Sequence, residues 1–347
     1  MKKLFFLFLL FPTFVLAISS KAYVVMDMDS GRVLEGKNTD KQYLIASTTK
    51  ILTAITAIEY GNLEDVVTIN DSVLESFGSG IYVSIGEKML LDDLLYGLLL
   101  RSGNDAALAI AHHVGGSKES FVFLMNELAK KIGMNDSIFV NPSGLEERDG
   151  TGNMSTVVDM AKLMQYAMKN HEFRRITSTK EIIVKSDIKT YKWINKNKLL
   201  FLYDYCTGGK TGYTKKANRT LVTTASKDGM NLVVVTFQDG NDFLDHKALY
   251  EKYFSNYHSY LAISKDEDYG ENVRVIDDYN IMIRSGEEVT TRIEREGSNH
   301  LLNGSIAGKV YVLVNGKEVG YRNLYYEKKS VTENKSFLGK LLELLKR

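Results

Sequence analysis

Three short motifs contain residues that together could carry out nucleophilic catalysis. The first is Ser47-Thr48-Thr49-Lys50, in which the serine and the lysine are three positions apart. Residues i and i+3 of a helix lie on the same side, so the lysine amine can reach the serine hydroxyl. A serine hydroxyl becomes a strong nucleophile when a neighbouring base removes its proton, and a lysine is such a base once burial and nearby positive charge lower its pKa from about 10.4. Taken alone, this motif is more often a helix cap followed by a solvated lysine.

The second motif is Ser102-Gly103-Asn104, at a break between two apolar segments. Ser102 could pass a proton between Lys50 and a leaving group, and Asn104 could bind Lys50 or a substrate amide. Taken alone, this motif also fits a polar turn in which Asn104 and Asp105 cap the following helix.

The third motif is Lys210-Thr211-Gly212, which leads towards a predicted strand. Lys210 could bind a substrate carboxylate and keep Lys50 deprotonated by charge repulsion. Thr211 adds a hydroxyl, and Gly212 lets a peptide substrate approach the strand edge closely. A phosphate-binding glycine-rich loop does not fit, because the spacing Gly-x-x-x-x-Gly-Lys-Ser/Thr into a helix is absent.

Hydrophobic periodicity predicts the elements that position these motifs. An apolar helix that starts near Ser47 and ends at Gly61 has little polar face, so we expect it in the core. Alternating residues predict a hairpin near the N-terminus and a second one around a Lys-Asp-Gly turn. Strands are expected at 22–28, 32–35, 219–226 and 231–238, and helices in two pieces within 86–116 and at 117–133, 155–173 and 242–257. We therefore expect an α/β domain whose antiparallel sheet uses both chain ends and whose helical part is an insertion.

The C-terminal third has a different pattern. From about residue 272 it contains short alternating runs with Gly and Asn turns, which indicate a small all-β domain. The last segment, SFLGKLLELLKR, has apolar residues on one helical face and basic residues elsewhere, as in an amphipathic helix at a membrane surface. A partner helix or a core helix would also fit that pattern.

The N-terminus and the composition limit the compartment and the partners. Lys2 and Lys3 precede a short apolar run that ends in small residues near Ala17, which predicts a secretory signal peptide rather than a retained anchor. A formal net charge of +1 gives no reason to expect a nucleic-acid partner. Cys206 is the only cysteine and is expected to pack, and His112-His113 lacks companion ligands, so we expect no metal and no cofactor. The chain is therefore predicted to divide into a signal peptide at 1–17, the α/β domain at 18–260, the β-rich domain at 261–330 and the amphipathic helix at 331–347.

The order and context of the three motifs resemble those of the serine D-alanyl-D-alanine carboxypeptidases, which are low-molecular-weight penicillin-binding proteins. Members of that family carry Ser-x-x-Lys, Ser-x-Asn and Lys-Thr-Gly. Other segments that look like the family are ASTTKILTA, GEKMLLDDLLYGLLLRSGNDAA, NPSGLE, STVVDMAKLM and GGKTGYT. The resemblance implies a β-lactamase/transpeptidase-like α/β catalytic domain, followed by the β-rich domain and the amphipathic tail.

The resemblance also implies roles for individual residues. Ser47 would form the acyl-enzyme, Lys50 would be the base, and Ser102 and Asn104 would complete a proton relay. The terminal carboxylate of the substrate would be bound by the Lys-Thr-Gly segment. Its substrate-binding residues would be Lys210, Thr211, Gly212, Tyr213 and Thr214. The backbone N–H groups of residues 47 and 213 would form the oxyanion hole, and Arg219 is a further candidate for carboxylate binding.

The expected activity is removal of the terminal D-alanine from peptidoglycan stem peptides, with β-lactam antibiotics as covalent inhibitors. The same motifs would also suit a DD-endopeptidase, a β-lactamase or a cell-wall-binding module without turnover. The chain contains nothing that resembles the setting of the additional glutamate of class A β-lactamases. We expect the protein to be exported and to lie at the outer face of the cytoplasmic membrane, held there peripherally by its C-terminal helix.

Overall fold

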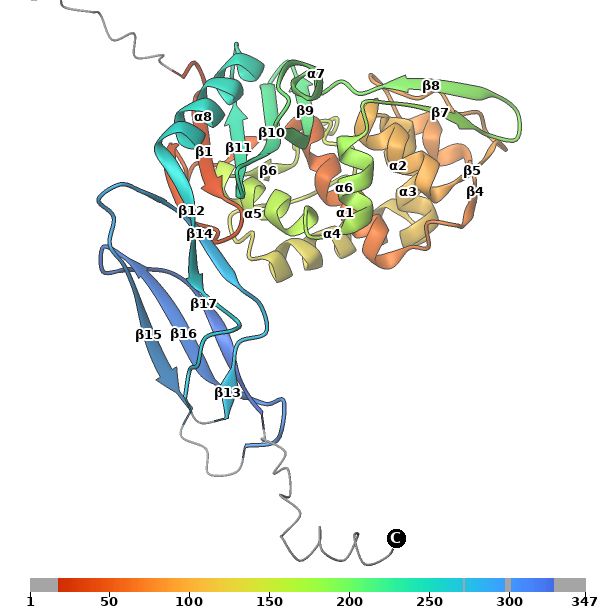
Figure 1. Ribbon diagram of the computed structural model, residues 1–347. Helices are drawn as coiled ribbons and strands as arrows, with labels where there is room; N and C mark the ends of the chain where they lie inside the picture. The colour runs from red at the N-terminus through yellow and green to blue at the C-terminus, as the bar shows by residue number, and fades with distance from the viewer. Residues whose placement is uncertain (1–17, 271, 297–300, 328–347) are drawn as a thin grey trace, which may run out of the picture. The chain divides into compact units, whose positions relative to one another are not determined.

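The computed structural model describes residues 18–270, 272–296 and 301–327 (Figure 1). The chain forms two compact units, Met1–His258 and Ser259–Arg347. The predicted signal peptide (1–17) and tail helix (331–347) lie outside the described residues. In the described ranges, no helix is both long enough and apolar enough to cross a membrane.

A five-stranded antiparallel sheet forms the centre of the first unit. Its strands are β1 (Ala22–Asp27), β2 (Val33–Lys37), β9 (Cys206–Thr214), β10 (Asn218–Lys227) and β11 (Met230–Phe237). They are arranged in the order β2-β1-β11-β10-β9, so strands from both ends of the unit lie side by side. This confirms the two hairpins and the composite sheet that the alternating residues predicted. The strand β9, which carries the Lys-Thr-Gly motif, lies at the edge of the sheet.

The two faces of the sheet are covered by different helices. On β10, Val222 points into the core beneath the inserted helices, whereas the next side chain, Thr223, bonds His246 of α8 (Asp242–Asn256) on the other face. This alternation follows from the two-residue period of a strand. The inserted helices are α1 (Lys50–Tyr60), α2 (Leu91–Leu100), α3 (Asn104–Gly115), α4 (Lys118–Ile132), α5 (Val157–Ala167), α6 (His171–Ser178) and the short α7 (Leu199–Leu202).

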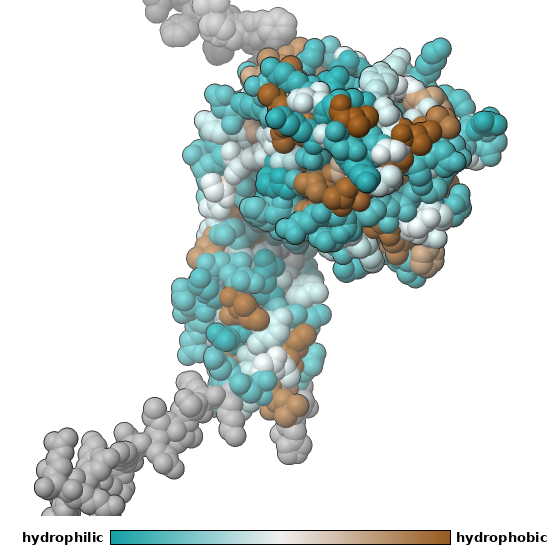
Figure 2. Space-filling model, turned by 90° about the vertical axis from the view of Figure 1, so that its right-hand side faces the viewer, coloured by the Kyte–Doolittle hydropathy of each residue, from teal (hydrophilic) through white to brown (hydrophobic). Residues whose placement is uncertain are grey.

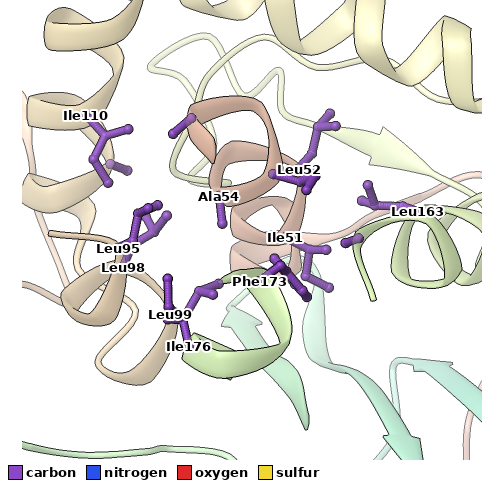
Figure 3. Packing of buried hydrophobic residues seen from close by; sticks show 14 of the residues in the cluster. Ile51, Leu52, Ala54, Leu95, Leu98, Leu99, Ile110, Leu163, Phe173 and Ile176 are labelled. Carbon is purple, nitrogen blue, oxygen red and sulfur yellow. The ribbon is translucent and has the colours of Figure 1, made fainter. Parts of the chain in front are cut away.

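Helix α1 is the centre of the hydrophobic core, as its sequence predicted. Every residue from Lys50 to Ala57 is buried. Figure 3 shows side chains of α1 surrounded by those of four other helices. The labelled residues are Ile51, Leu52 and Ala54 of α1, Leu95, Leu98 and Leu99 of α2, Ile110 of α3, Leu163 of α5, and Phe173 and Ile176 of α6. The base of the first motif therefore lies at the start of a helix that the hydrophobic core surrounds.

Two details of the helical prediction were wrong. The single helix expected at 155–173 is two helices, because Asn170 accepts a hydrogen bond from the Phe173 N–H and caps α6. Helix α3 is preceded by Gly103, which makes no side-chain cap, so the expected capping by Asn104 and Asp105 is not observed. The Asp105 carboxylate instead accepts hydrogen bonds from the backbone of the loop around Ile81.

Short elements complete the first unit. They are the strand pairs β3 (Tyr43–Leu44) with β6 (Met154–Ser155), β4 (Val66–Thr68) with β5 (Lys88–Leu90), and β7 (Glu181–Lys185) with β8 (Thr190–Ile194), and the 3-10 helices η1 (Ala46–Thr49) and η2 (Asp71–Glu75). On the face that Figure 2 shows, hydrophobic side chains form separate small patches among hydrophilic ones.

The described part of the second unit contains strands and turns. A four-stranded antiparallel sheet has the order β13-β17-β16-β15, and β12 pairs with β14. Their bounds are β12 (Tyr257–Ile263), β13 (Val273–Arg274), β14 (Tyr279–Arg284), β15 (Val289–Arg295), β16 (Ile306–Val314) and β17 (Lys317–Tyr326). Val310, Val312 and Leu324 lie in its own hydrophobic core. These strands lie in the region where alternating residues from about 272 onward predicted strands.

Candidate active site

The first motif folds as a tight turn followed by a helix. Ser47 lies on η1, and α1 begins only at Lys50, so the serine lies one turn ahead of the α-helix that its motif was expected to start. The Lys50 Nζ atom is nevertheless 3.1 Å from the Ser47 Oγ atom. The expected contact between nucleophile and base is thus present, although a 3-10 turn supplies it.

Lys50 has three hydrogen-bond partners, and two of them can only accept. Its Nζ lies 2.7 Å from Asn104 Oδ1 and 2.5 Å from the Ser143 carbonyl oxygen. A neutral amine has two N–H groups and one lone pair. Since the two carbonyl oxygens take up both N–H groups, the lone pair of a neutral Lys50 is directed at the Ser47 hydroxyl. This is the arrangement that a general base requires.

The surroundings of Lys50 also favour its neutral form. Its side chain is completely buried, and this burial is the largest cause that lowers its pKa to about 7. The positive charge of Lys196 lowers the pKa further, while the negative charge of Asp105 acts in the opposite direction. A base with a pKa near neutrality combines a large neutral fraction with useful proton affinity.

The turn that contains Ser143 was missed as part of the site. The Asn141 side chain accepts hydrogen bonds from the N–H groups of Ser143 and Gly144 and so shapes the turn. Gly144 has a φ of +83°, and a Cβ atom on it would lie 1.9 Å from the carbonyl oxygen of Ala46. The sequence shows only an Asn-Pro-Ser-Gly turn here, which reveals nothing about what the turn packs against.

The two polar residues of the second motif, Ser102 and Asn104, have different surroundings. Asn104 is buried. Its Oδ1 accepts a hydrogen bond from Lys50, and its Nδ2 donates to the Phe77 carbonyl oxygen at 2.6 Å, so it links the base to the loop that follows η2. Ser102 has a φ of +64° and lines the same cleft as Ser47. In the part of the chain that the structure describes, the Ser102 hydroxyl has no hydrogen-bond partner. It is therefore close to the nucleophile without being joined to it.

A cleft of about 460 Å³ lies in front of the nucleophile. Lys196 and Lys198 line it, and neither was identified from the sequence. The Lys196 amine donates to Ser79 Oγ at 3.1 Å, and burial, followed by the charge of Arg101, lowers its pKa. The other lining residues are Ser47, Ser79, Ser102, Thr211, Gly212, Tyr213, Arg219, Asp242 and Phe243. The cleft thus joins the nucleophile to several positive charges.

Lys210 of the third motif is buried behind this cleft rather than lining it. Its amine donates to the Thr211 carbonyl oxygen at 2.7 Å. Burial holds its pKa well below the usual range, and the positive charges of Lys50 and Lys196 lower it further. The positive charges of Lys50 and Lys210 thus disfavour each other, and Lys196, a lysine outside the motif, adds a further positive charge that lowers the pKa of Lys50.

Gly212 brings the edge strand against the nucleophile. A Cβ atom on it would lie 2.3 Å from Thr220 Oγ1 and 3.0 Å from the backbone nitrogen of Ser47. Only a glycine lets β9 approach the Ser47 N–H group so closely. Tyr213, which follows, is largely exposed and lines the cleft. Backbone of the strand and of η1 therefore meet where an oxyanion hole would be needed.

Two further candidate residues are held by carboxylates. Thr214 does not line the cleft; its hydroxyl donates to Glu146 and accepts from the Ala217 N–H, which closes the turn after β9. Arg219 does line the cleft, and its guanidinium makes two hydrogen bonds to Asp242, at 3.0 and 2.7 Å. Such a paired fork holds the guanidinium in one orientation.

Other reactive side chains have structural surroundings. Burial raises the pKa of the Cys206 thiol to about 11, which makes it a poor nucleophile at neutral pH. Among the described residues, no group of three or more His, Cys, Asp or Glu side chains is placed to hold a metal ion.

Comparison with known proteins defines the class to which this fold and site belong. Residues 12–241 match the model of the D-alanyl-D-alanine carboxypeptidase family, Peptidase_S11. The chain therefore belongs to this family of serine peptidases. The match includes all three motifs and the turn at Asn141–Gly144.

Individual relatives agree with this assignment. The chain is 34% identical over 228 residues to the D-alanyl-D-alanine carboxypeptidase DacF of Bacillus subtilis, a match that covers 64% of the chain and 58% of that relative. It is 35% identical to DacB2 of Mycobacterium tuberculosis, with 62% and 73% covered. The crystal structure of penicillin binding protein 5 from Haemophilus influenzae is similar with a TM-score of 0.76 and 26% identity, over 90% of this chain and 97% of that one.

Proposed function

We propose that this protein is a serine-type D-Ala-D-Ala carboxypeptidase that removes the terminal D-alanine from peptidoglycan pentapeptide stems. Membership of the carboxypeptidase family supports this activity. The observation that carries the proposal is the placement of Lys50, whose two carbonyl partners leave its lone pair directed at the Ser47 hydroxyl. A β-lactamase is not favoured, because the family and the relatives are carboxypeptidases.

Acylation then begins with proton transfer from Ser47 to Lys50. The Oγ atom attacks the carbonyl carbon of the penultimate D-alanine, and its proton passes to the Lys50 Nζ atom. The oxyanion that forms would be stabilised by the backbone N–H groups of Ser47 and Tyr213, because Gly212 lets β9 approach the Ser47 N–H group closely. When the intermediate collapses, the peptide bond breaks and the leaving D-alanine nitrogen takes a proton. Ser102, which lines the same cleft as Ser47, would relay that proton.

Deacylation uses the same base. Once D-alanine has left, water takes its place beside Lys50, which removes a proton as the water attacks the ester on Ser47. The ester bond breaks, the proton returns to the serine oxygen, and the shortened stem peptide leaves. Hydrolysis of the ester in this way separates a carboxypeptidase from a protein that is only acylated.

The substrate is expected to lie along β9. The strand has no neighbour on its outer side in the sheet, so an extended peptide can pair with it. The C-terminal carboxylate of the substrate would meet the Thr211 hydroxyl and the positive charges of Lys196 and Arg219. Lys210 would act from behind the strand. Thr214 is the weakest of these candidates, since Glu146 already holds its hydroxyl.

The location is part of the same proposal. A chain that acts on peptidoglycan must be exported, in agreement with the signal-like residues 1–17. We propose that the enzyme acts in the cell envelope, with a catalytic domain at 18–260 and a β-rich domain at 261–330. Residues 331–347 would attach it peripherally to the outer face of the cytoplasmic membrane. β-Lactams would acylate Ser47 as covalent inhibitors.

Two assays test the activity. In the first, mass spectrometry of the penicillin adduct compares the native chain with Ser47→Ala, and the adduct is expected only in the native chain. In the second, D-alanine release is measured from a pentapeptide that ends in D-Ala-D-Ala. Acylation without D-alanine release would contradict the carboxypeptidase proposal, and an adduct in the Ser47→Ala chain would remove the nucleophile assignment.

A further inference from the structure

The first described residues of the chain are bound to two acidic side chains near the start of α8. The Ser19 N–H donates to Asp245 Oδ2 at 2.7 Å. The Ser19 hydroxyl lies 2.5 Å from Asp239 Oδ1 and 2.9 Å from Asp245 Oδ2. Since a hydroxyl has one proton to donate, it can satisfy only one of these two carboxylates at a time. The site therefore has more acceptors than donors.

Both carboxylates are buried, and among the described residues one of their oxygens has no hydrogen-bond partner. Asp239 is 1% exposed and Asp245 is 3% exposed. Asp239 Oδ2 is buried without a hydrogen bond. Within residues 18–270, no lysine, arginine or histidine forms an ion pair with either carboxylate. Arg219, whose pKa the charge of Asp239 helps to raise, forms its ion pair with Asp242 instead. Two buried carboxylates next to each other without an ion-pair partner of their own are costly, and burial and the charge of Asp245 raise the pKa of Asp239 accordingly.

We propose that Asp239 and Asp245 form a binding site for the α-ammonium group that signal-peptide removal creates at Ile18. This inference rests on the proposed cleavage after Ala17, and it does not depend on the proposed enzymatic activity. Backbone bond lengths place the nitrogen of one residue within about 3.7 Å of the next nitrogen along the chain. The Ile18 nitrogen therefore lies within about 6.4 Å of Asp245 Oδ2, given the 2.7 Å bond from Ser19. An α-ammonium group there supplies a positive charge and three N–H donors to a site whose carboxylates have no ion-pair partner among residues 18–270 and in which Asp239 Oδ2 has no hydrogen bond.

The site is connected to the catalytic cleft. The N–H group of Asn241 points to Ser19 Oγ at 3.3 Å and to Asp239 Oδ1 at 3.1 Å. The next residue, Asp242, begins α8 and holds Arg219 in the cleft. Binding of the new N-terminus thus stabilises the turn that positions Arg219. In the uncleaved precursor, residue 18 has an uncharged peptide N–H, so that stabilisation is missing.

The experiment uses the exported, processed chain, whose first residue is identified by mass spectrometry. The pKa of its α-amine is measured from the pH dependence of acetylation of the N-terminal peptide. We expect a pKa above the ordinary range of about 7.7–8.0, because nearby carboxylates favour the charged form. In Asp239→Asn/Asp245→Asn the pKa is expected to return to that range. Asp228→Asn, in the turn between β10 and β11, is the matched control and should leave it unchanged.

A chemical block tests the same contact without removing a carboxylate. In Ile18→Gln the N-terminal glutamine can be cyclised to pyroglutamate, which removes the charge from an otherwise intact chain. We expect cyclisation to lower the Tm by about 2–4 °C, as for a loss of one interaction in a domain of this size. In Asp239→Asn/Asp245→Asn, cyclisation should have no effect.

Three results would overturn the proposal. They are a mature chain that starts at Ser20 or later, an α-amine that titrates in the ordinary range, and equal melting of the cyclised and uncyclised chains. Penicillin acylation, measured on the same samples, reports on the catalytic proposal separately. A chain that is acylated but has an ordinary α-amine would refute this inference and leave the proposed function intact.

Discussion

Gly144 packs against Ala46 so closely that a Cβ atom on residue 144 would lie 1.9 Å from the Ala46 carbonyl oxygen. Ala46 precedes Ser47, and Gly144 follows Ser143, whose carbonyl oxygen accepts a hydrogen bond from the Lys50 amine. The two turns therefore fix the relative positions of Ser47 and Lys50 through direct backbone contact. The pairing of nucleophile and base depends on this contact as much as on the spacing within the first motif.

Gly144→Ala should therefore impair acylation. The added methyl group must move one of the two turns, and a misplacement of about 1 Å in an active site costs roughly 100-fold in rate. We expect a loss of that size in the rate of acylation by a fluorescent penicillin. Gly133→Ala is the matched control, since Gly133 has a φ of +85° and nothing within 4 Å of the added Cβ. Both variants should lose stability, and equal acylation rates would contradict the explanation.

Lys196→Ala should shift the pH dependence of acylation. Only neutral Lys50 can accept the serine proton, so the rate should rise with pH through the Lys50 pKa of about 7. Removal of the positive charge of Lys196 raises that pKa, and the midpoint should therefore move to higher pH. Lys198→Ala removes a different lysine from the lining of the same cleft and serves as the control, in which the midpoint should move less. An unshifted midpoint in Lys196→Ala would argue against this electrostatic coupling.

Asp105→Asn should shift the same profile in the opposite direction. The Asp105 charge raises the pKa of Lys50, so its removal should lower the midpoint of the acylation profile. The variant should also be less stable by about 1–3 kcal/mol, because the carboxylate accepts backbone hydrogen bonds from Ile81 and Tyr82. Thermal unfolding and stopped-flow acylation measure the two effects separately. A midpoint that moves upward would show that the loop, and not the charge, controls the base.

His246 should make the catalytic unit sensitive to acid. It is completely buried between Thr223 and Thr236, and burial lowers its pKa from 6.5 to about 3. Between these two values the unfolded chain binds a proton that the folded chain does not, so stability falls as the pH decreases from 6.5 towards 3. His246→Gln keeps a side chain that can bond both hydroxyls but cannot be protonated. We expect its unfolding free energy to depend less on pH in this window, as measured by urea unfolding at several pH values.

Local patterns predicted the parts of the site that neighbouring residues determine. Ser47 and Lys50 are three positions apart, so any helical turn brings them together. The strand expected after Lys210 is β10, whereas Lys210 itself lies on β9, a strand for which no bounds were predicted. Ser143 and Lys196 were missed because they lie far from the three motifs along the chain. The folded chain brings the Ser143 carbonyl oxygen and the Lys196 charge to Lys50, and no local pattern in the sequence predicts that.

The wrong helix at 155–173 has a comparable cause. Its apolar spacing continues across the junction between α5 and α6, while the capping side chain of Asn170 ends the run locally. Periodicity records which face is apolar, but a single side-chain hydrogen bond decides where a helix restarts. Thr214 was expected to bind substrate, but its hydroxyl is bonded to Glu146. Glu146 lies on a different loop, so the sequence around Thr214 does not reveal this contact.

The composite sheet has a consequence for how the chain is made. Ala22 on β1 pairs with Phe237 on β11, so β1 can pair with β2 at once, but its other edge has no partner until almost the whole first unit has been synthesised. Contacts between such distant residues form slowly, because a long loop must close first. The hairpin of β1 and β2 therefore waits for β11, and the five-stranded sheet is complete only when nearly all of the first unit is present.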